Sequence, residues 1–287
     1  MPSRLAIVSL AVGSPLCRRR VIVLLGGLVR ISAAGRTDVG RKRAHNEDRI
    51  FVGQQTWVVA DGMGGHAAGE IASEFVVSSL EAIDAFEDLR SSDVIDAVGA
   101  ANQRILDHTR AWPESAGMGT TVAGLASVKV GGASHWAIFN VGDSRVYRCQ
   151  GGALKRATVD HSETEELILA GKITEAEARH HESRNVITRS IGSQPPPQVD
   201  LWLLPQTPGE RFVVCSDGVT SELPDERIAE IVLPALSPQA AVDDLVEAAL
   251  MAGGHDNISA IVVDLWADAD AEPEEATLPR VRIEEVL

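Results

Sequence analysis

The chain has 287 residues, of which 45% are hydrophobic, and a formal net charge of −15 from 26 basic and 41 acidic side chains. This size and composition are typical of one enzyme-sized globular domain. The acidic balance argues against a sequence-independent grip on nucleic-acid phosphates and favours divalent cations as partners. Three cysteines without Cys-x-x-Cys spacing exclude a disulfide framework and a cysteine-held zinc site, which indicates a reducing, cytoplasmic location.

The two ends of the chain differ from its middle. Residues 1–30 carry five Arg and no acidic residue, whereas residues 267–287 carry seven acidic residues and two Arg. The two apolar runs before residue 30 are shorter than the roughly 20 residues a membrane helix needs, and their order does not match a signal peptide. We therefore expect an N-terminal extension over 1–30 without stable order, one domain over 31–266, a disordered acidic tail over 267–287 and no membrane span.

Strands and helices follow in a dense pattern along the middle of the chain. Runs rich in β-branched and aromatic residues predict strands at Ile50–Val52, Thr56–Ala60, Thr121–Val130, His135–Val141, Arg145–Cys149, Leu154–Arg156, Val199–Leu204, Arg211–Cys215 and Ile258–Leu265. Turn residues predict hairpins at Gly131-Gly132, Gly142-Asp143 and Gly151-Gly152. Helices are predicted at Ala67–Phe86, Ser91–Arg110, Glu163–Ala170, Thr174–Arg179, Pro224–Leu233 and Pro238–Ala252. This order favours a layered α+β sandwich with antiparallel sheets.

Five acidic segments lie at turns, most of them beside a short apolar run. They are Asn46-Glu47-Asp48, Asp61-Gly62-Met63-Gly64-Gly65-His66, Gly142-Asp143-Ser144-Arg145, Ser216-Asp217-Gly218 and His255-Asp256-Asn257. Each alone is explained as well by a helix cap or an Asx turn. Together they supply the carboxylate oxygens that Mg²⁺ and Mn²⁺ prefer. Because two such ions activate water and clamp phosphoryl oxygens, the set predicts phosphoester hydrolysis.

Eight segments in order resemble the bacterial metal-dependent serine/threonine phosphatases of the PP2C type. They are Arg43-Ala44-His45-Asn46-Glu47-Asp48, Asp61-Gly62-Met63-Gly64-Gly65-His66, Gly117-Met118-Gly119-Thr120-Thr121, Val141-Gly142-Asp143-Ser144-Arg145, Asp160-His161-Ser162, Arg184-Asn185-Val186-Ile187-Thr188-Arg189, Ser216-Asp217-Gly218 and Asp256-Asn257-Ile258-Ser259. The match covers residues 31–266. The resemblance implies an α+β fold, a four-layer α-β-β-α sandwich of two central, mainly antiparallel sheets flanked by helices. It also implies hydrolysis of phosphoserine and phosphothreonine by a hydroxide that bridges two metal ions.

The resemblance also implies a set of metal ligands. By motif these are Glu47, Asp48, Asp61, Gly62, Asp143, Asp217 and Asp256. Asp61 would bridge two Mn²⁺ or Mg²⁺ ions, and Gly62 would offer its carbonyl. Asp217 and Asp256 would hold the other ion. In the bacterial members a third, weaker metal position exists, which Asp143 and Asp217 match here.

The remaining roles are implied with different support. Glu47 and Asp48 match acidic positions that ligate directly or through water. Arg43 matches the arginine that holds the substrate phosphate, and a guanidinium can bind two phosphate oxygens at once. Where eukaryotic members have a histidine directly after Asp-Gly, this chain has Met63, and its histidine follows at His66. His66 is therefore a candidate general acid or, equally, a loop residue at the start of a helix.

Other functions stay open beside this one. The segment from Asp160 to about Asp200 resembles the mobile flap of the family, which influences substrate choice.

The expected partners are phosphoserine and phosphothreonine proteins, among them a Ser/Thr protein kinase and its targets. The expected state is a monomer that binds no nucleic acid. The alternatives are a catalytically inactive regulatory binding module and a small-phosphoester hydrolase. A cysteine-dependent phosphatase is excluded, because no cysteine is followed six residues later by arginine.

Overall fold

Two antiparallel sheets form the centre of the protein. The structure, a computed structural model, describes residues 17–24, 27–64 and 68–267. The first sheet has the order β1 (Cys17–Leu24), β2 (Gly27–Asp38), β13 (Ile258–Ala267), β12 (Glu210–Cys215), β9 (Arg145–Gln150) and β10 (Ala153–Arg156). The second has the order β11 (Asp200–Pro205), β8 (Ala133–Val141), β7 (Val122–Val130), β4 (Thr56–Ala60) and β3 (Arg49–Val52). A short pair, β5 (Gly62–Met63) and β6 (Gly119–Thr120), lies beside them.

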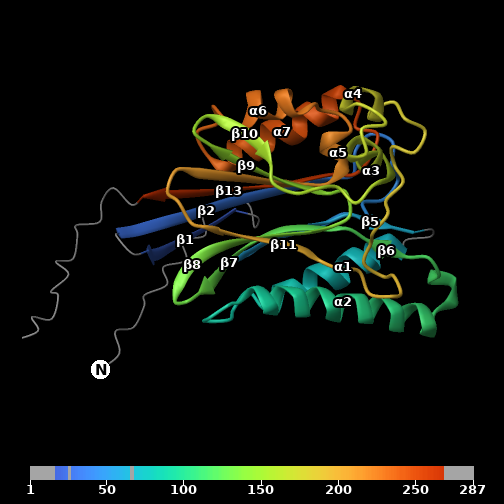
Figure 1. Cartoon of the computed structure of the whole chain (residues 1–287), viewed down its shortest axis with the longest axis horizontal. Helices are drawn as coiled ribbons and strands as arrows, with labels where there is room; N and C mark the ends of the chain where they lie inside the picture. The colour runs from blue at the N-terminus through green and yellow to red at the C-terminus, as the bar shows by residue number, and fades with distance from the viewer. Residues whose placement is uncertain (1–16, 25–26, 65–67, 268–287) are drawn as a thin grey trace, which may run out of the picture.

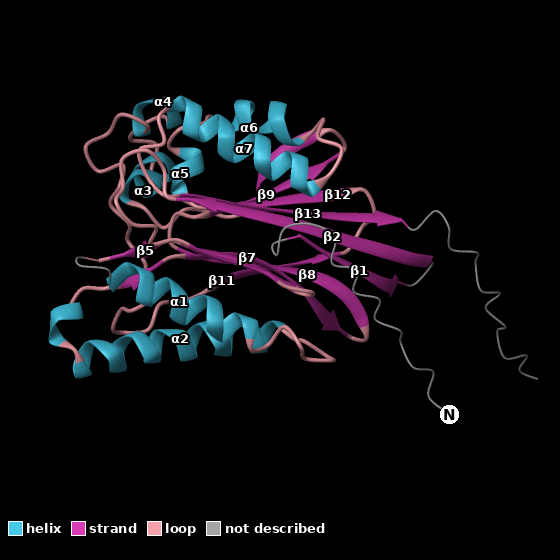
Figure 2. Ribbon diagram, turned by 180° about the vertical axis from the view of Figure 1, so that it is seen from behind, coloured by secondary structure: helices cyan, strands magenta, loops and turns pink. Residues whose placement is uncertain are grey.

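Helices cover the outer face of each sheet, which completes four layers (Figures 1 and 2). On one side lie α1 (Ala68–Glu81) and α2 (Ser91–Ala111), followed by the 3₁₀ turn η1 (Pro113–Ser115). On the other lie α5 (Asp217–Thr220), α6 (Asp225–Val232) and α7 (Pro238–Ala252). Two short helices, α3 (Glu163–Leu169) and α4 (Glu175–Ala178), belong to the segment that joins β10 to β11. The predicted α-β-β-α sandwich is confirmed, and no described helix is long and apolar enough to cross a membrane.

Three apolar clusters hold the layers together, one between the sheets and one beneath each helical layer. Between the sheets, Trp136 makes edge-to-face contacts with Trp57 and Phe212 at centroid distances of 5.9 and 5.3 Å. The strands that cross this core are buried on both faces, as in β4 and β12. The apolar runs before Asp61 and Asp217 are therefore core strands, and each acidic residue follows where its strand leaves the core.

Strand β2 runs from Gly27 to Asp38, across the predicted boundary at residue 30, and pairs with β1 and β13. Its centre, Ala33-Ala34-Gly35, has low intrinsic strand propensity and gave no strand signal. The small residues are needed for packing: a Cβ on Gly35 would lie 2.7 Å from Cγ2 of Val52. Residues 1–16 and 268–287 belong to the two ends that the sequence predicts to lack stable order, and they lie outside the described residues.

Two local predictions are also corrected. Gly142-Asp143 is not a hairpin, since β8 and β9 lie in different sheets and the turn carries the chain from one to the other. The predicted first helix is too long at its end, because Asp84 has left the helix to accept the backbone N–H groups of residues 54, 55 and 56 at 2.8 to 3.0 Å. The hairpins at residues 131–132 and 151–152 are confirmed, with positive φ at all four glycines.

Candidate active site

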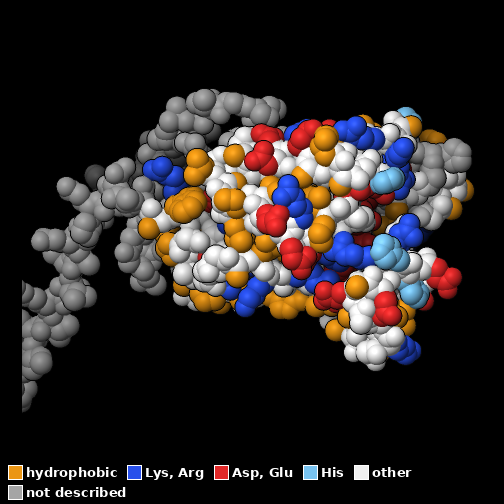
Figure 3. Space-filling view, turned by 90° about the horizontal axis from the view of Figure 1, so that it is seen from above, with side chains coloured by type: hydrophobic (Ala, Val, Ile, Leu, Met, Phe, Trp, Pro, Cys, Tyr) orange, Lys and Arg blue, Asp and Glu red, His pale blue; other side chains and the backbone are white. Residues whose placement is uncertain are grey.

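The predicted acidic turns meet at one end of the two sheets. Asp61 follows β4, Asp143 follows β8 and Asp217 follows β12, while Asp256 lies just before β13. A cavity of about 670 Å³ opens between them, and its wall includes Arg43, Glu47, Asp61, Gly62, Asp143, Asp217 and Asp256. In the space-filling view, basic and histidine side chains gather around a hollow at this end of the molecule (Figure 3). Seven of the nine predicted site residues therefore share one cavity.

The carboxyl groups at the cavity floor repel one another. The carboxyl groups of Asp61 and Asp217 are close enough to interact directly. Burial, together with the charges of Asp48, Asp217 and Asp143, raises the pKa of Asp61 well above its usual value. Burial and the charge of Asp256 likewise raise the pKa of Asp217. Carboxyl groups crowded together in this way form a site that a cation would stabilise.

Asp48 lies deeper than the others, with 1% of its surface exposed. Burial raises its pKa to about 7, and hydrogen bonds from Ser259 and Ser216 partly oppose that rise. Its Oδ2 accepts the hydroxyl of Ser216 at 2.8 Å, but its Oδ1 has no hydrogen-bond partner. Burial and the charge of Asp217 raise the pKa of Asp143 to about 8. A buried carboxylate oxygen without a hydrogen-bond partner, such as Oδ1 of Asp48, is explained by a cation or water that binds there.

These donors fit hard divalent ions. Carboxylates and the Gly62 carbonyl are the oxygen ligands that Mg²⁺ and Mn²⁺ prefer. No group of three Asp, Glu, His or Cys side chains in the described part of the chain could hold a metal ion by itself. Such ions usually keep several waters and take only one or two protein carboxylates each, so a shell completed by water fits this geometry. Because protons leave these acids when a metal binds, affinity for metal should rise with pH.

Arg43 lies at the mouth of the cavity and pairs with a predicted metal ligand. Its Nη2 is 2.7 Å from Oδ2 of Asp256, and half of its side chain is exposed. The hydrogen bond to Asp256 raises the pKa of the guanidinium, and the charges of Glu47 and Asp61 act in the same direction. The guanidinium is therefore within reach of both the acidic floor and an incoming anion.

The predicted proton donor, His66, lies outside the described residues. Two other histidines line the cavity, His180 from the α4 end of the β10–β11 segment and His255. His255 directly precedes Asp256 in the sequence. Its Nδ1 lies 2.7 Å from Oε1 of Glu222. The sequence offered no reason to place His180 here, because it depends on how the segment folds back over the site.

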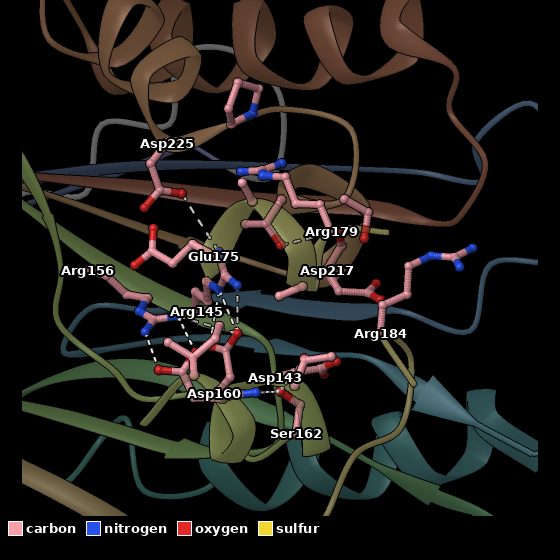
Figure 4. A pocket seen from close by; sticks show the side chains of 18 of the residues that line it. Asp143, Arg145, Arg156, Asp160, Ser162, Glu175, Arg179, Arg184, Asp217 and Asp225 are labelled. Atoms are coloured by element: carbon pink, nitrogen blue, oxygen red, sulfur yellow. Dashed lines mark hydrogen bonds and ion pairs between the residues drawn. The ribbon is translucent and has the colours of Figure 1, made fainter. Parts of the chain in front are cut away.

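A second cavity of about 570 Å³ adjoins the first and shares Asp143 and Asp217 with it. Arg145 lies in its wall and is 2.6 Å from Asp160 and 3.7 Å from Asp225 (Figure 4). Asp160 begins the β10–β11 segment, and Arg156 lies 3.6 Å from the same carboxylate. Arg145 thus attaches this segment beside Asp143, a structural role that its motif position did not reveal.

Glycine at position 218 allows two acid-bearing turns to touch. A Cβ there would lie 1.9 Å from the carbonyl oxygen of Asn257, which is backbone and cannot swing away. We expect Gly218→Ala to separate Asp217 from Asp256, to destabilise the fold by about 1 to 3 kcal/mol, and to weaken metal binding. Gly99→Ala is the matched control, because nothing lies within 4 Å of its Cβ position on α2. Urea unfolding and Mn²⁺ titration of both variants test this, and equal behaviour would contradict it.

Comparisons with known proteins identify the family of the chain. The family model for protein phosphatase 2C matches residues 38–251. The chain is 35% identical to the serine/threonine protein phosphatase PstP of Mycobacterium tuberculosis over 240 residues, 81% of this chain and 44% of PstP. It is 34% identical to the serine/threonine phosphatase stp of Listeria welshimeri over 242 residues, 80% of this chain and 94% of stp. The chain thus spans less than half of PstP but nearly all of stp.

Solved structures agree with the sequence relatives. The catalytic domain of PstP in complex with two manganese ions superposes with a TM-score of 0.75 at 32% identity, covering 83% of this chain and 99% of that domain. The family match spans most of the chain, including the predicted ligands from Glu47 to Asp217. The chain belongs to the protein phosphatase 2C family.

Proposed function

We propose that the chain removes phosphate from phosphoserine and phosphothreonine residues of proteins with Mn²⁺ or Mg²⁺ as cofactor. The observation that carries this is the meeting of acidic turns from both sheets on one cavity, whose wall includes Asp61, Asp143 and Asp217. The relatives named serine/threonine phosphatases and the manganese complex of PstP support the same activity.

Each site residue then has a task. Bound ions would supply a water of lowered pKa and clamp the phosphoryl oxygens. Asp61, Gly62, Asp217 and Asp256 would hold the two ions, and Asp143 with Asp217 would hold a third, weaker one.

Arg43 pairs with Asp256 here, and its two-pronged guanidinium would orient the substrate phosphate. Glu47 and Asp48 would hold the ions directly or through water. The proton donor to the departing serine or threonine oxygen is assigned to His66.

The setting of the reaction is part of the proposal. Cys149 and Cys215 are both free thiols, which supports a reducing, cytoplasmic location. The net charge of −15 speaks against nucleic-acid partners. The catalytic unit would act as a monomer and include β1 and β2, and a Ser/Thr kinase and its targets are the substrates that fit.

Two alternatives remain distinct from this function. A small-phosphoester hydrolase would need only the cavity at the acids, yet the second cavity beside Asp143 leaves room for residues that flank a phosphorylated side chain. An inactive binding module would be expected to lack one of the carboxylates, but all of them are present.

Substrate class is tested by comparing kcat/KM for a phosphothreonine peptide and for p-nitrophenyl phosphate, both with saturating Mn²⁺. We expect the peptide to be preferred by at least about tenfold, since its flanking residues add contacts in the second cavity and remote contacts lower the barrier. Preference for the small ester would contradict a protein phosphatase and support the hydrolase alternative.

A further inference from the structure

Two buried hydroxyl groups support the carboxylate of Asp48. The Oγ of Ser216 donates to its Oδ2 at 2.8 Å, and Ser259 hydrogen bonds to the same carboxyl group. The backbone N–H of Ser259 donates to Oγ of Ser216 at 3.1 Å, which directs the Ser216 proton toward the acid. Both serines are fully buried.

A chain of hydrogen bonds extends from Ser259 through Thr37 to Asn46. The Nδ2 of Asn46 is a donor only, and it lies 2.8 Å from Oγ1 of Thr37. The Thr37 hydroxyl is 2.7 Å from Oγ of Ser259. The Asp48 N–H donates to Oδ1 of Asn46 at 3.1 Å, so the chain of hydrogen bonds begins and ends at Asp48.

The chain of groups also joins the two sheets. Thr37 lies in β2, Ser259 lies in β13 and Ser216 follows β12, all in the first sheet. Asp48 directly precedes β3, which lies in the second sheet. Ser216 stands at the N-cap of α5, yet its side chain makes no capping bond. Its hydroxyl is committed to the carboxylate instead.

We propose that Ser216, Ser259 and Thr37 are positioning residues that fix Oδ2 of Asp48 and leave its Oδ1 for a cation or its water. The hydroxyl proton of Ser216 points toward Oδ2, because the backbone N–H of Ser259 donates to that hydroxyl oxygen. The other carboxylate oxygen, Oδ1, is buried and has no hydrogen-bond partner among the described residues. Partners of this kind orient metal ligands, and their loss typically costs 10- to 100-fold in metal affinity. The inference rests on the proposed metal-dependent function.

The test is the Mn²⁺ dissociation constant of the metal-free protein, measured by isothermal titration calorimetry without substrate. Ser216→Ala and Ser259→Ala should each weaken Mn²⁺ binding by about tenfold, while kcat at saturating Mn²⁺ changes little. Ser259→Thr keeps a hydroxyl and should bind as the wild type does. The matched control is Ser127→Ala, which removes a buried hydroxyl that contacts Gln206 at 2.9 Å on β7. Its affinity should be unchanged.

A second background shows whether the serines act through the acid. In Asp48→Asn, adding Ser216→Ala should not weaken Mn²⁺ binding further. Wild-type affinity in both alanine variants, or a further loss in the Asp48→Asn background, would overturn the proposal. If Ser216→Ala does not fold, Ser259→Ala and Ser259→Thr decide, and equal weakening in both would overturn it. Loss of phosphatase activity in the wild type is a separate result, because the calorimetry needs no substrate.

Discussion

Asp61→Asn is expected to lower kcat/KM for a phosphothreonine peptide by about 10³-fold or more. Asp61 is the one predicted ligand shared by two ions, and it is already in contact with Asp217. Losing one charge between two cations removes roughly 4 kcal/mol of stabilisation, which corresponds to that factor. Phosphate release in saturating Mn²⁺ measures the effect. Asp244→Asn, an exposed position on α7, is the control with the same chemical change.

The same variant should not lose stability. In the metal-free protein the Asp61 carboxylate is disfavoured by burial and by three neighbouring acids, so its pKa is raised. A raised acid pKa means that the folded protein loses stability as pH rises through that pKa. An uncharged Asn removes this cost, so the melting temperature of metal-free Asp61→Asn should equal or exceed that of the wild type at pH 8. A large drop would mean that inactivity reports unfolding, and retained activity would remove Asp61 from the mechanism.

Arg43→Ala has the second largest expected effect, a fall in kcat/KM of about 10²-fold. Charge-assisted hydrogen bonds of this kind contribute about 1.5 to 3 kcal/mol each, and the guanidinium can form two of them with one phosphate group. Arg43→Lys keeps the positive charge but cannot bind two phosphate oxygens in the planar geometry of a guanidinium, so it should recover only part of the lost kcat/KM. Steady-state kinetics on the phosphothreonine peptide measure both variants, with Arg41→Ala as the exposed neighbouring control.

Metal binding separates this role from a structural one. Arg43 pairs with Asp256 in the metal-free protein and so competes with a cation for that carboxylate. Arg43→Ala should therefore bind Mn²⁺ at least as tightly as the wild type. Weaker Mn²⁺ binding with unchanged kcat/KM at saturation would show that Arg43 organises the metal site and does not hold phosphate.

The acidic site was largely predictable because its signals are local. Asp61 and Asp217 each follow a core strand and precede a glycine, a pattern that can be read without knowing the fold. Their convergence on one site was predicted from the five turns taken together and from the ordered family motifs. Physical reasoning on separate turns left each one open, since an Asx turn looks the same in sequence.

The parts that were missed depend on contacts between distant residues. Ser216 and Asp48 are 168 positions apart, and Thr37 and Ser259 are 222 apart, so no local pattern links them. Strand β2 was missed because Ala33 and Gly35 are small for packing reasons that only the neighbouring sheet imposes. His180 likewise reaches the cavity through the path of its segment rather than through any motif.

The most direct test of the account is phosphate release from a phosphothreonine peptide by the metal-free chain, before and after Mn²⁺ or Mg²⁺ is added. We expect turnover only with added metal, and EDTA should abolish it reversibly, because the carboxylates of Asp61, Asp217 and Asp256 have no other catalytic use here. Undiminished turnover in excess EDTA would contradict the metal site. No turnover with any divalent ion, despite Mn²⁺ binding, would contradict the enzyme and leave a binding module.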